Sequence, residues 1–61
     1  MLSVGDLVEF GIDKSVFICT RVWAHCLSIR EIGSDYPPSI IDQAHAADLI
    51  KNRKMRIISK A

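Results

Sequence analysis

The sequence predicts one small domain over residues 1–61, mainly β, with four or five antiparallel strands forming a small barrel. Three features of the chain support this fold class. Apolar and polar residues alternate near the start, β-branched and aromatic residues are dense over residues 15–24, and two successive prolines at 37–38 exclude a helix there. At 61 residues the chain lies near the lower size limit of a single domain.

The first strand is expected over residues 8–12. Val8, Phe10 and Ile12 alternate with Glu9 and Gly11, which gives the strand one apolar face. The aspartate and lysine that follow favour a turn.

Residues 15–24 carry the strongest strand signal in the chain. Val16, Ile18, Thr20 and Val22 are expected on one face, and the other face is expected to hold Phe17, Cys19, Arg21 and Trp23. Because both faces are largely apolar, this strand is predicted to be central or to meet a partner.

Residues 26–32 are predicted to form the next strand, with Leu27 and Ile29 facing inward and Ser28 and Arg30 outward. The link before it contains no Gly, Asn or Pro, so the hairpin turn is weakly indicated. One long bent strand is the alternative. A loop follows over residues 33–38, where glycine, serine and the two prolines gather.

Residues 39–52 give a mixed signal. Their alanines favour a helix, but the four large apolar residues Ile40, Ile41, Leu49 and Ile50 do not fall on one helical stripe. We therefore expect an irregular segment with a short helical turn over residues 44–50. The alternative is one helix over residues 39–51, in an α+β fold with a three-stranded meander and a C-terminal strand.

The last strand is expected over residues 53–59. Met55 and Ile57 fall on one of its faces, and Lys54 and Arg56 fall on the other. The basic residues should therefore line an exposed side of a terminal strand, where charge also opposes edge-to-edge aggregation.

Two parts of the chain resemble SH3-like small β-barrels. The segment Val4–Phe10, with a Gly-Asp pair ahead of alternating apolar residues, resembles the first strand of that class. The segments Ala47–Ile50 and Met55–Ile58 resemble its short helical turn and last strand. The resemblance implies a scaffold that binds protein, RNA or DNA. Proline-peptide binding is not expected, because no acidic loop accompanies the single tryptophan, Trp23.

Neither catalysis nor a cofactor is expected. The three glycines do not form a phosphate-binding loop, and the spacing of Cys19, His25, Cys26 and His45 matches no zinc site. The two cysteines are expected to be reduced and packed. No apolar run reaches the length of a membrane span and no signal peptide is recognised, so we expect a cytoplasmic protein without a membrane partner. No small-molecule substrate is evident.

The leading functional hypothesis is a non-catalytic interaction module. It would bind a protein partner, or a second copy of itself, through a sheet face formed by Phe17, Arg21 and Trp23. Tryptophan and arginine are enriched where interfaces hold most of their binding energy.

Nucleic-acid binding is the alternative hypothesis. The net charge is only +1, but every charged residue after Asp48 is basic. The segment would contact phosphates through Lys51, Arg53, Lys54 and Arg56, and exposed aromatic residues would have to lie beside it to stack on bases. A third, weaker hypothesis is a small phage- or plasmid-type regulator of a host protein.

Overall fold

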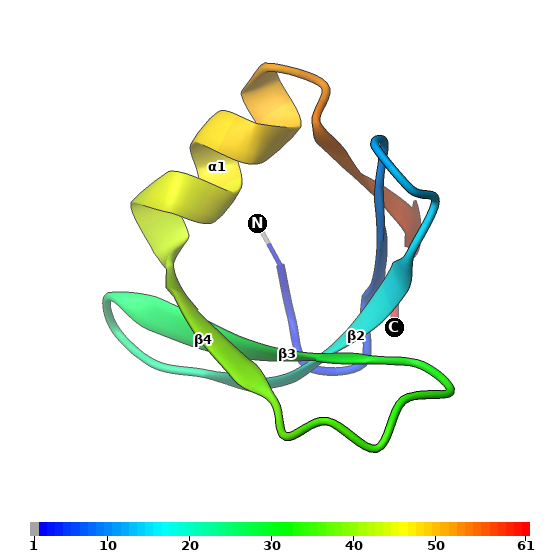
Figure 1. Ribbon diagram of the computed structural model, residues 1–61. Helices are drawn as coiled ribbons and strands as arrows, with labels where there is room; N and C mark the ends of the chain where they lie inside the picture. Colours follow the sequence, from blue (N-terminus) through cyan, green and yellow to red (C-terminus); the bar gives the residue numbers. More distant parts are fainter. Residues whose placement is uncertain (1) are drawn as a thin grey trace.

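The computed structural model describes residues 2–61 as one antiparallel sheet and one helix (Figure 1). The elements in chain order are β1 (Leu7–Phe10), β2 (Val16–Val22), β3 (Cys26–Glu31), β4 (Ser39–Asp42), α1 (Gln43–Lys51) and β5 (Met55–Ser59). The strands lie in the order β4-β3-β2-β1-β5, and every neighbouring pair is antiparallel. The mainly β class, the five strands and the short helix are therefore confirmed.

The sheet curls but does not close into a barrel. Over residues 2–61, β4 pairs only with β3 and β5 pairs only with β1, so each is an edge strand. Helix α1 spans the gap between these two edges and contacts both of them (Figure 1). The predicted barrel closure is wrong because a helix, rather than a β4–β5 ladder, covers the open side.

The hydrophobic core lies inside the curl, between the concave face of the sheet and α1. Its buried members come from all parts of the chain: Leu2, Val8, Cys19, Leu27, Ile29, Ala46 and Met55. A second group of half-buried apolar side chains packs around them: Phe10, Phe17, Ile41, Leu49, Ile50 and Ile57. Four strands contribute two alternate residues each and β4 contributes Ile41 alone, which agrees with a sheet that has one covered face.

The first strand is shorter than expected. β1 ends at Phe10, and Ile12 is 93% exposed in the following turn, so its predicted place on the apolar face is wrong. The turn bends early because the amide of Lys14 donates to the carbonyl of Phe10 (3.0 Å). Lys14 adopts a left-handed φ of 63° there, which breaks the alternation.

The β2–β3 hairpin is confirmed, and the single bent strand is wrong. The amide of Trp23 donates to the carbonyl of Cys26 at 2.8 Å and closes the hairpin. In β3, Leu27 and Ile29 are buried in the core as predicted. Ser28 faces the other way but is also buried, at 5% exposed.

Residues 39–51 divide into a strand and a helix. The helical turn predicted near residues 44–50 is confirmed, whereas a helix starting at residue 39 is wrong. Residues 39–42 are extended because they pair with β3, where Ile41 lies opposite Leu27. The N-cap of α1 is Asp42, whose side chain makes no capping hydrogen bond. No helix within residues 2–61 is long and apolar enough to cross a membrane.

A buried carboxylate ties the two ends of the described chain to the start of β1. Asp6 is 0% exposed and accepts hydrogen bonds from the amide of Ser3 (2.9 Å) and the amide of Ala61 (2.8 Å). Its third partner is the ammonium group of Lys60, at 2.7 Å. The Lys60 hydrogen bond and the two backbone hydrogen bonds lower the pKa of Asp6 to about 2.

Candidate functional site

The convex side of β2, β3 and β4, opposite the core, is the first candidate interaction surface. We call it the outer face, and it carries Arg21, Trp23, Cys26, Arg30 and Ile40. Strand register defines it. Residues directly opposite each other share a face, and the pairs Arg21–Ser28, Ser28–Ile40 and Ile18–Arg30 all lie on the side away from Leu27 and Ile29.

A bulge in β2 brings Arg21 and Trp23 to this face. Cys19 lies opposite Ile29 and is buried in the core, but the register shifts between Cys19 and Arg21. The extra residue, Thr20, donates from its hydroxyl to the Ser28 hydroxyl at 2.9 Å. A bulge moves the following side chains to the opposite face. Arg21 and Trp23 therefore leave the side on which Cys19 lies.

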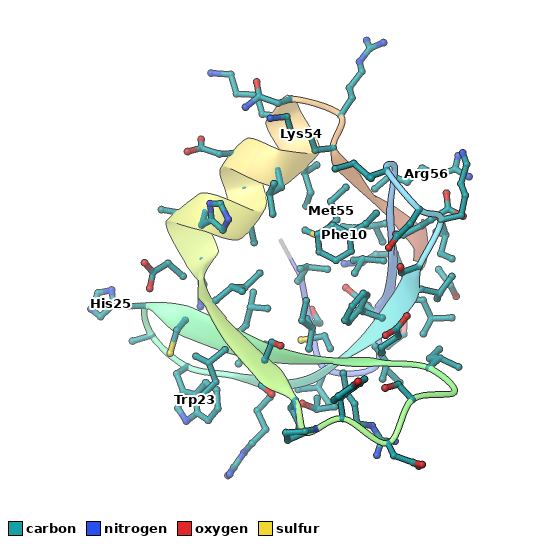
Figure 2. All side chains as sticks on the ribbon, in the orientation of Figure 1. Phe10, Trp23, His25, Lys54, Met55 and Arg56 are labelled. Atoms are coloured by element: carbon teal, nitrogen blue, oxygen red, sulfur yellow. The ribbon has the colours of Figure 1, made fainter. Side chains whose placement is uncertain are left out.

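The predicted interface trio is divided as a result. Phe17 lies before the bulge and packs against the core, where its ring meets Phe10 edge-on with centroids 5.1 Å apart. Trp23 projects away from the sheet on the side opposite Phe10 and Met55 (Figure 2). Phe17 therefore does not contribute to the outer face, whereas Arg21 and Trp23 remain together.

Arg21 and Trp23 form a stacked pair. The guanidinium carbon of Arg21 lies 5.5 Å from the centroid of the Trp23 ring, which is within the range of a cation–π contact. Trp23 is 39% exposed and Ile40 is 66% exposed. Both line a shallow apolar depression of about 340 Å³, whose other walls are Ala24, His25 and Cys26.

The hairpin that presents Trp23 is anchored from beneath by α1. The side-chain amide of Gln43 donates to the carbonyl of Trp23, and the backbone amide of Gln43 donates to the carbonyl of His25 at 3.0 Å. These bonds connect the first residue of the helix to the hairpin tip. The backbone of Trp23 is therefore held by tertiary contacts as well as by the strand pairing.

Sequence reasoning missed Ile40 as a member of this surface. It assigned residue 40 to an irregular segment, and the structure makes it part of an edge strand. The adjacent β-branched pair Ile40-Ile41, separated from two prolines by Ser39 alone, was the available signal.

The basic candidates lie elsewhere in the fold. Lys51 ends α1, Arg53 and Lys54 form the turn after it, and Arg56 lies on the exposed side of β5. Arg56 pairs with Glu9 of the neighbouring strand, with 3.0 Å between Nε and Oε1. A polar depression of about 270 Å³ gathers part of this group and is lined by Glu9, Gly11, Lys14, Arg53, Met55 and Arg56.

The exposed Trp23 ring does not lie beside the basic segment. Figure 2 places Trp23 at the end of the molecule opposite Lys54 and Arg56. Phe17 is in contact with the core. Neither Trp23 nor Phe17 therefore supplies a ring beside Lys54 and Arg56 on which the bases of single-stranded nucleic acid could stack.

The cysteines and histidines remain dispersed. Cys19 is buried and Cys26 is half-buried, and both are free thiols. Burial first, and then the carboxylate of Asp6, raise the pKa of the Cys19 thiol, which disfavours the reactive thiolate. Within residues 2–61, no three His, Cys, Asp or Glu side chains lie close enough together to hold a metal ion.

Comparisons with protein-family models, curated proteins and solved structures give no match to this chain. The candidate site is therefore defined by the chain's own geometry. Its strongest element is the stacked Arg21–Trp23 pair beside Ile40 on the outer face.

Proposed function

We propose that this protein is a non-catalytic interaction module that binds a protein partner through the outer face. The observation that carries the proposal is a half-exposed tryptophan, held under an arginine and bordered by an exposed isoleucine, on one face of the sheet. Tryptophan and arginine lead the residues that dominate binding energy at protein interfaces. The core and α1 lie on the other side of the sheet, and Trp23 and Ile40 remain 39% and 66% exposed on the outer face.

The charge on the outer face supports a partner with an acidic rim. Arg21 and Arg30 are both exposed there, against one carboxylate, Asp42, which lies opposite Cys26. An acidic partner group would meet Arg21 while an apolar group fills the depression beside Trp23. A second copy of the chain is one partner that could supply such groups, since the protein contains both acidic and apolar surface residues.

We also propose an SH3-like scaffold for this module. Five short strands, the last of which follows a short helix, support that assignment.

The test combines binding measurements with the fluorescence of the single tryptophan, Trp23. Sedimentation over a wide concentration range measures self-association, and cross-linking in the cell of origin followed by purification identifies other partners. Trp23→Ala should weaken the complex by about 30-fold or more, because hot-spot truncations cost at least about 2 kcal/mol. Tyr36→Ala is the matched control, since Tyr36 is 79% exposed but does not line the depression.

Binding in this test should also shift the fluorescence emission of Trp23 as its ring leaves water. The proposal fails if Trp23→Ala retains every partner that the unaltered protein retains. It also fails if the emission of Trp23 is unchanged in the complex.

Nucleic-acid binding is the second candidate function, favoured by one observation. Lys14, from the turn after β1, joins Arg53 and Arg56 around the polar depression, which adds a cation that the sequence pattern did not group with them. Gel retardation of single-stranded RNA at low salt tests this function, and affinity should fall steeply as salt rises. Charge reversal by Arg53→Glu should abolish retardation, whereas Arg30→Glu on the outer face should not.

A further inference from the structure

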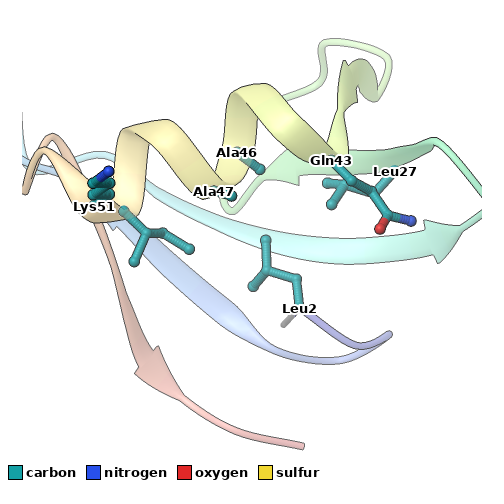
Figure 3. A pocket seen from close by; sticks show the side chains of 7 residues that line it. Leu2, Leu27, Gln43, Ala46, Ala47 and Lys51 are labelled. Carbon is teal, nitrogen blue, oxygen red and sulfur yellow. The ribbon is translucent and has the colours of Figure 1, made fainter.

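An apolar groove lies between α1, β3 and Leu2, on the side of the sheet opposite the outer face (Figure 3). Its volume is about 410 Å³. This size falls in the range of small-molecule sites, which run from about 300 to 1,000 Å³. Its lining consists of Leu2, Leu27, Gln43, Ala46, Ala47, Ile50 and Lys51.

Small side chains on the helix keep the groove open. Ala46 and Ala47 stand on α1 where longer residues would reach across to Leu2 and Leu27 (Figure 3). Leu2, Leu27 and Ala46 are each at most 5% exposed, so the floor of the groove is continuous with the hydrophobic core. Water in such a groove finds few polar partners, and an apolar occupant would displace it favourably.

Only two residues of the lining, Gln43 and Lys51, have polar side chains. The amide nitrogen of Gln43 already donates to the carbonyl of Trp23. Lys51 is the one charged residue among the seven, and it forms no ion pair within residues 2–61. It lies in the last turn of α1, at one end of the groove. A ligand that fits this lining is apolar along its length and anionic at one end.

We infer that the groove binds a small amphipathic anion, with an alkyl chain along Leu2, Leu27 and Ala47 and its charged head group at Lys51. No local sequence pattern indicates such a site, because its residues come from three separate segments. The inference does not depend on the proposed protein interface, since the two sites lie on opposite sides of the sheet and share no lining residue.

Octanoate is the probe, and backbone-amide NMR on the intact chain is the measurement. Saturable shifts are expected at Leu2, Leu27 and Ala47, with little change at Trp23. Octanol should bind about 2- to 5-fold more weakly, which is the contribution of one exposed ion pair. Lys51→Gln should reduce the affinity for octanoate to that for octanol.

Ala47→Leu tests the volume of the groove. Ala47 is exposed on α1, and leucine is a good helix former, so the variant should fold while its side chain fills the groove. Octanoate affinity should fall by about tenfold or more. Ala44→Leu is the matched control, because Ala44 is exposed on the same helix but does not line the groove, and this variant should bind normally.

Three results would overturn the inference. They are octanoate shifts that do not saturate, octanoate shifts that centre on the outer face, and an octanoate affinity of Ala47→Leu equal to that of Ala44→Leu. Equal affinity for octanoate and octanol in the unaltered protein would refute the role of Lys51. Because the NMR mapping uses the unaltered chain, the inference remains testable even if Ala47→Leu does not fold.

Discussion

Arg53 follows the C-cap of α1 and has a φ of 60°, a left-handed backbone conformation that costs an L-residue about 1–2 kcal/mol and suits glycine. Two backbone hydrogen bonds hold it there. The amide of Arg53 donates to the carbonyl of Ile50 (3.1 Å), and the amide of Lys54 donates to the carbonyl of Leu49 (2.8 Å). This is the Schellman pattern, in which the left-handed residue is most often glycine.

Replacing Arg53 by glycine should therefore stabilise the protein. Relief of the backbone strain at residue 53 contributes about 1–2 kcal/mol to stability. The greater freedom of glycine in the unfolded chain subtracts about 0.4–1 kcal/mol from that gain. The net gain should be about 0.5–1 kcal/mol, which raises the midpoint of thermal unfolding by about 2–8 °C in a domain of this size. The lost side chain should matter little, because Arg53 is exposed and forms no ion pair within residues 2–61.

Urea unfolding followed by circular dichroism measures the change, with Arg53→Ala as the control. Alanine removes the same charge but keeps the left-handed strain, so it should not stabilise the protein. If alanine stabilises as much as glycine, relief of charge repulsion rather than backbone strain is the cause. If Arg53→Gly is less stable than the unaltered protein, the argument from the backbone conformation is refuted.

Acid should remove the contribution of the Asp6 carboxylate to the stability of the fold. Its native pKa of about 2 lies below the ordinary value of 3.8, so that contribution is complete above pH 3.8 and is lost as the pH falls toward 2. The stability gap between the unaltered protein and Asp6→Asn should close over that range in urea titrations, and a pH-independent gap would exclude the carboxylate as its source. Met55→Ala should lower the free energy of unfolding by about 2–5 kcal/mol, because Met55 is 1% exposed. Ile58→Ala should lower it far less in the same assay, because Ile58 is 41% exposed. Gly5→Ala should lower the midpoint of thermal unfolding, since Gly5 has a φ of 94° and an added Cβ would lie 2.9 Å from the Cβ of Ala61. An unchanged midpoint would show that the turn adapts to the added methyl group.

The candidate site could be predicted only in part. Arg21 and Trp23 were recognised from residue type, and the structure keeps them together on one face. Their separation from Phe17 was not predictable, because the bulge at Thr20 carries no glycine or other local marker. The bulge follows from matching β2 to β3, which is a long-range requirement of the sheet.

The buried carboxylate of Asp6 shows the same limit. Its Gly-Asp context marked the approach to a strand, but two of its three partners, Lys60 and Ala61, lie at the other end of the described chain. Sequence periodicity contains no information about such a contact, because the contact depends on β5 pairing beside β1.

By itself the sequence determined the class of the fold, the apolar faces of the strands at Leu27, Ile29, Met55 and Ile57, and the short helix near residues 44–50. These features follow from residue propensity and local periodicity, which act within a few residues. Only the tertiary structure decided that the sheet stays open, that α1 covers the gap, and that Trp23 turns outward while a groove remains beneath the helix. Those outcomes depend on strand register and on the packing volume between distant segments, and neither is a local property of the chain.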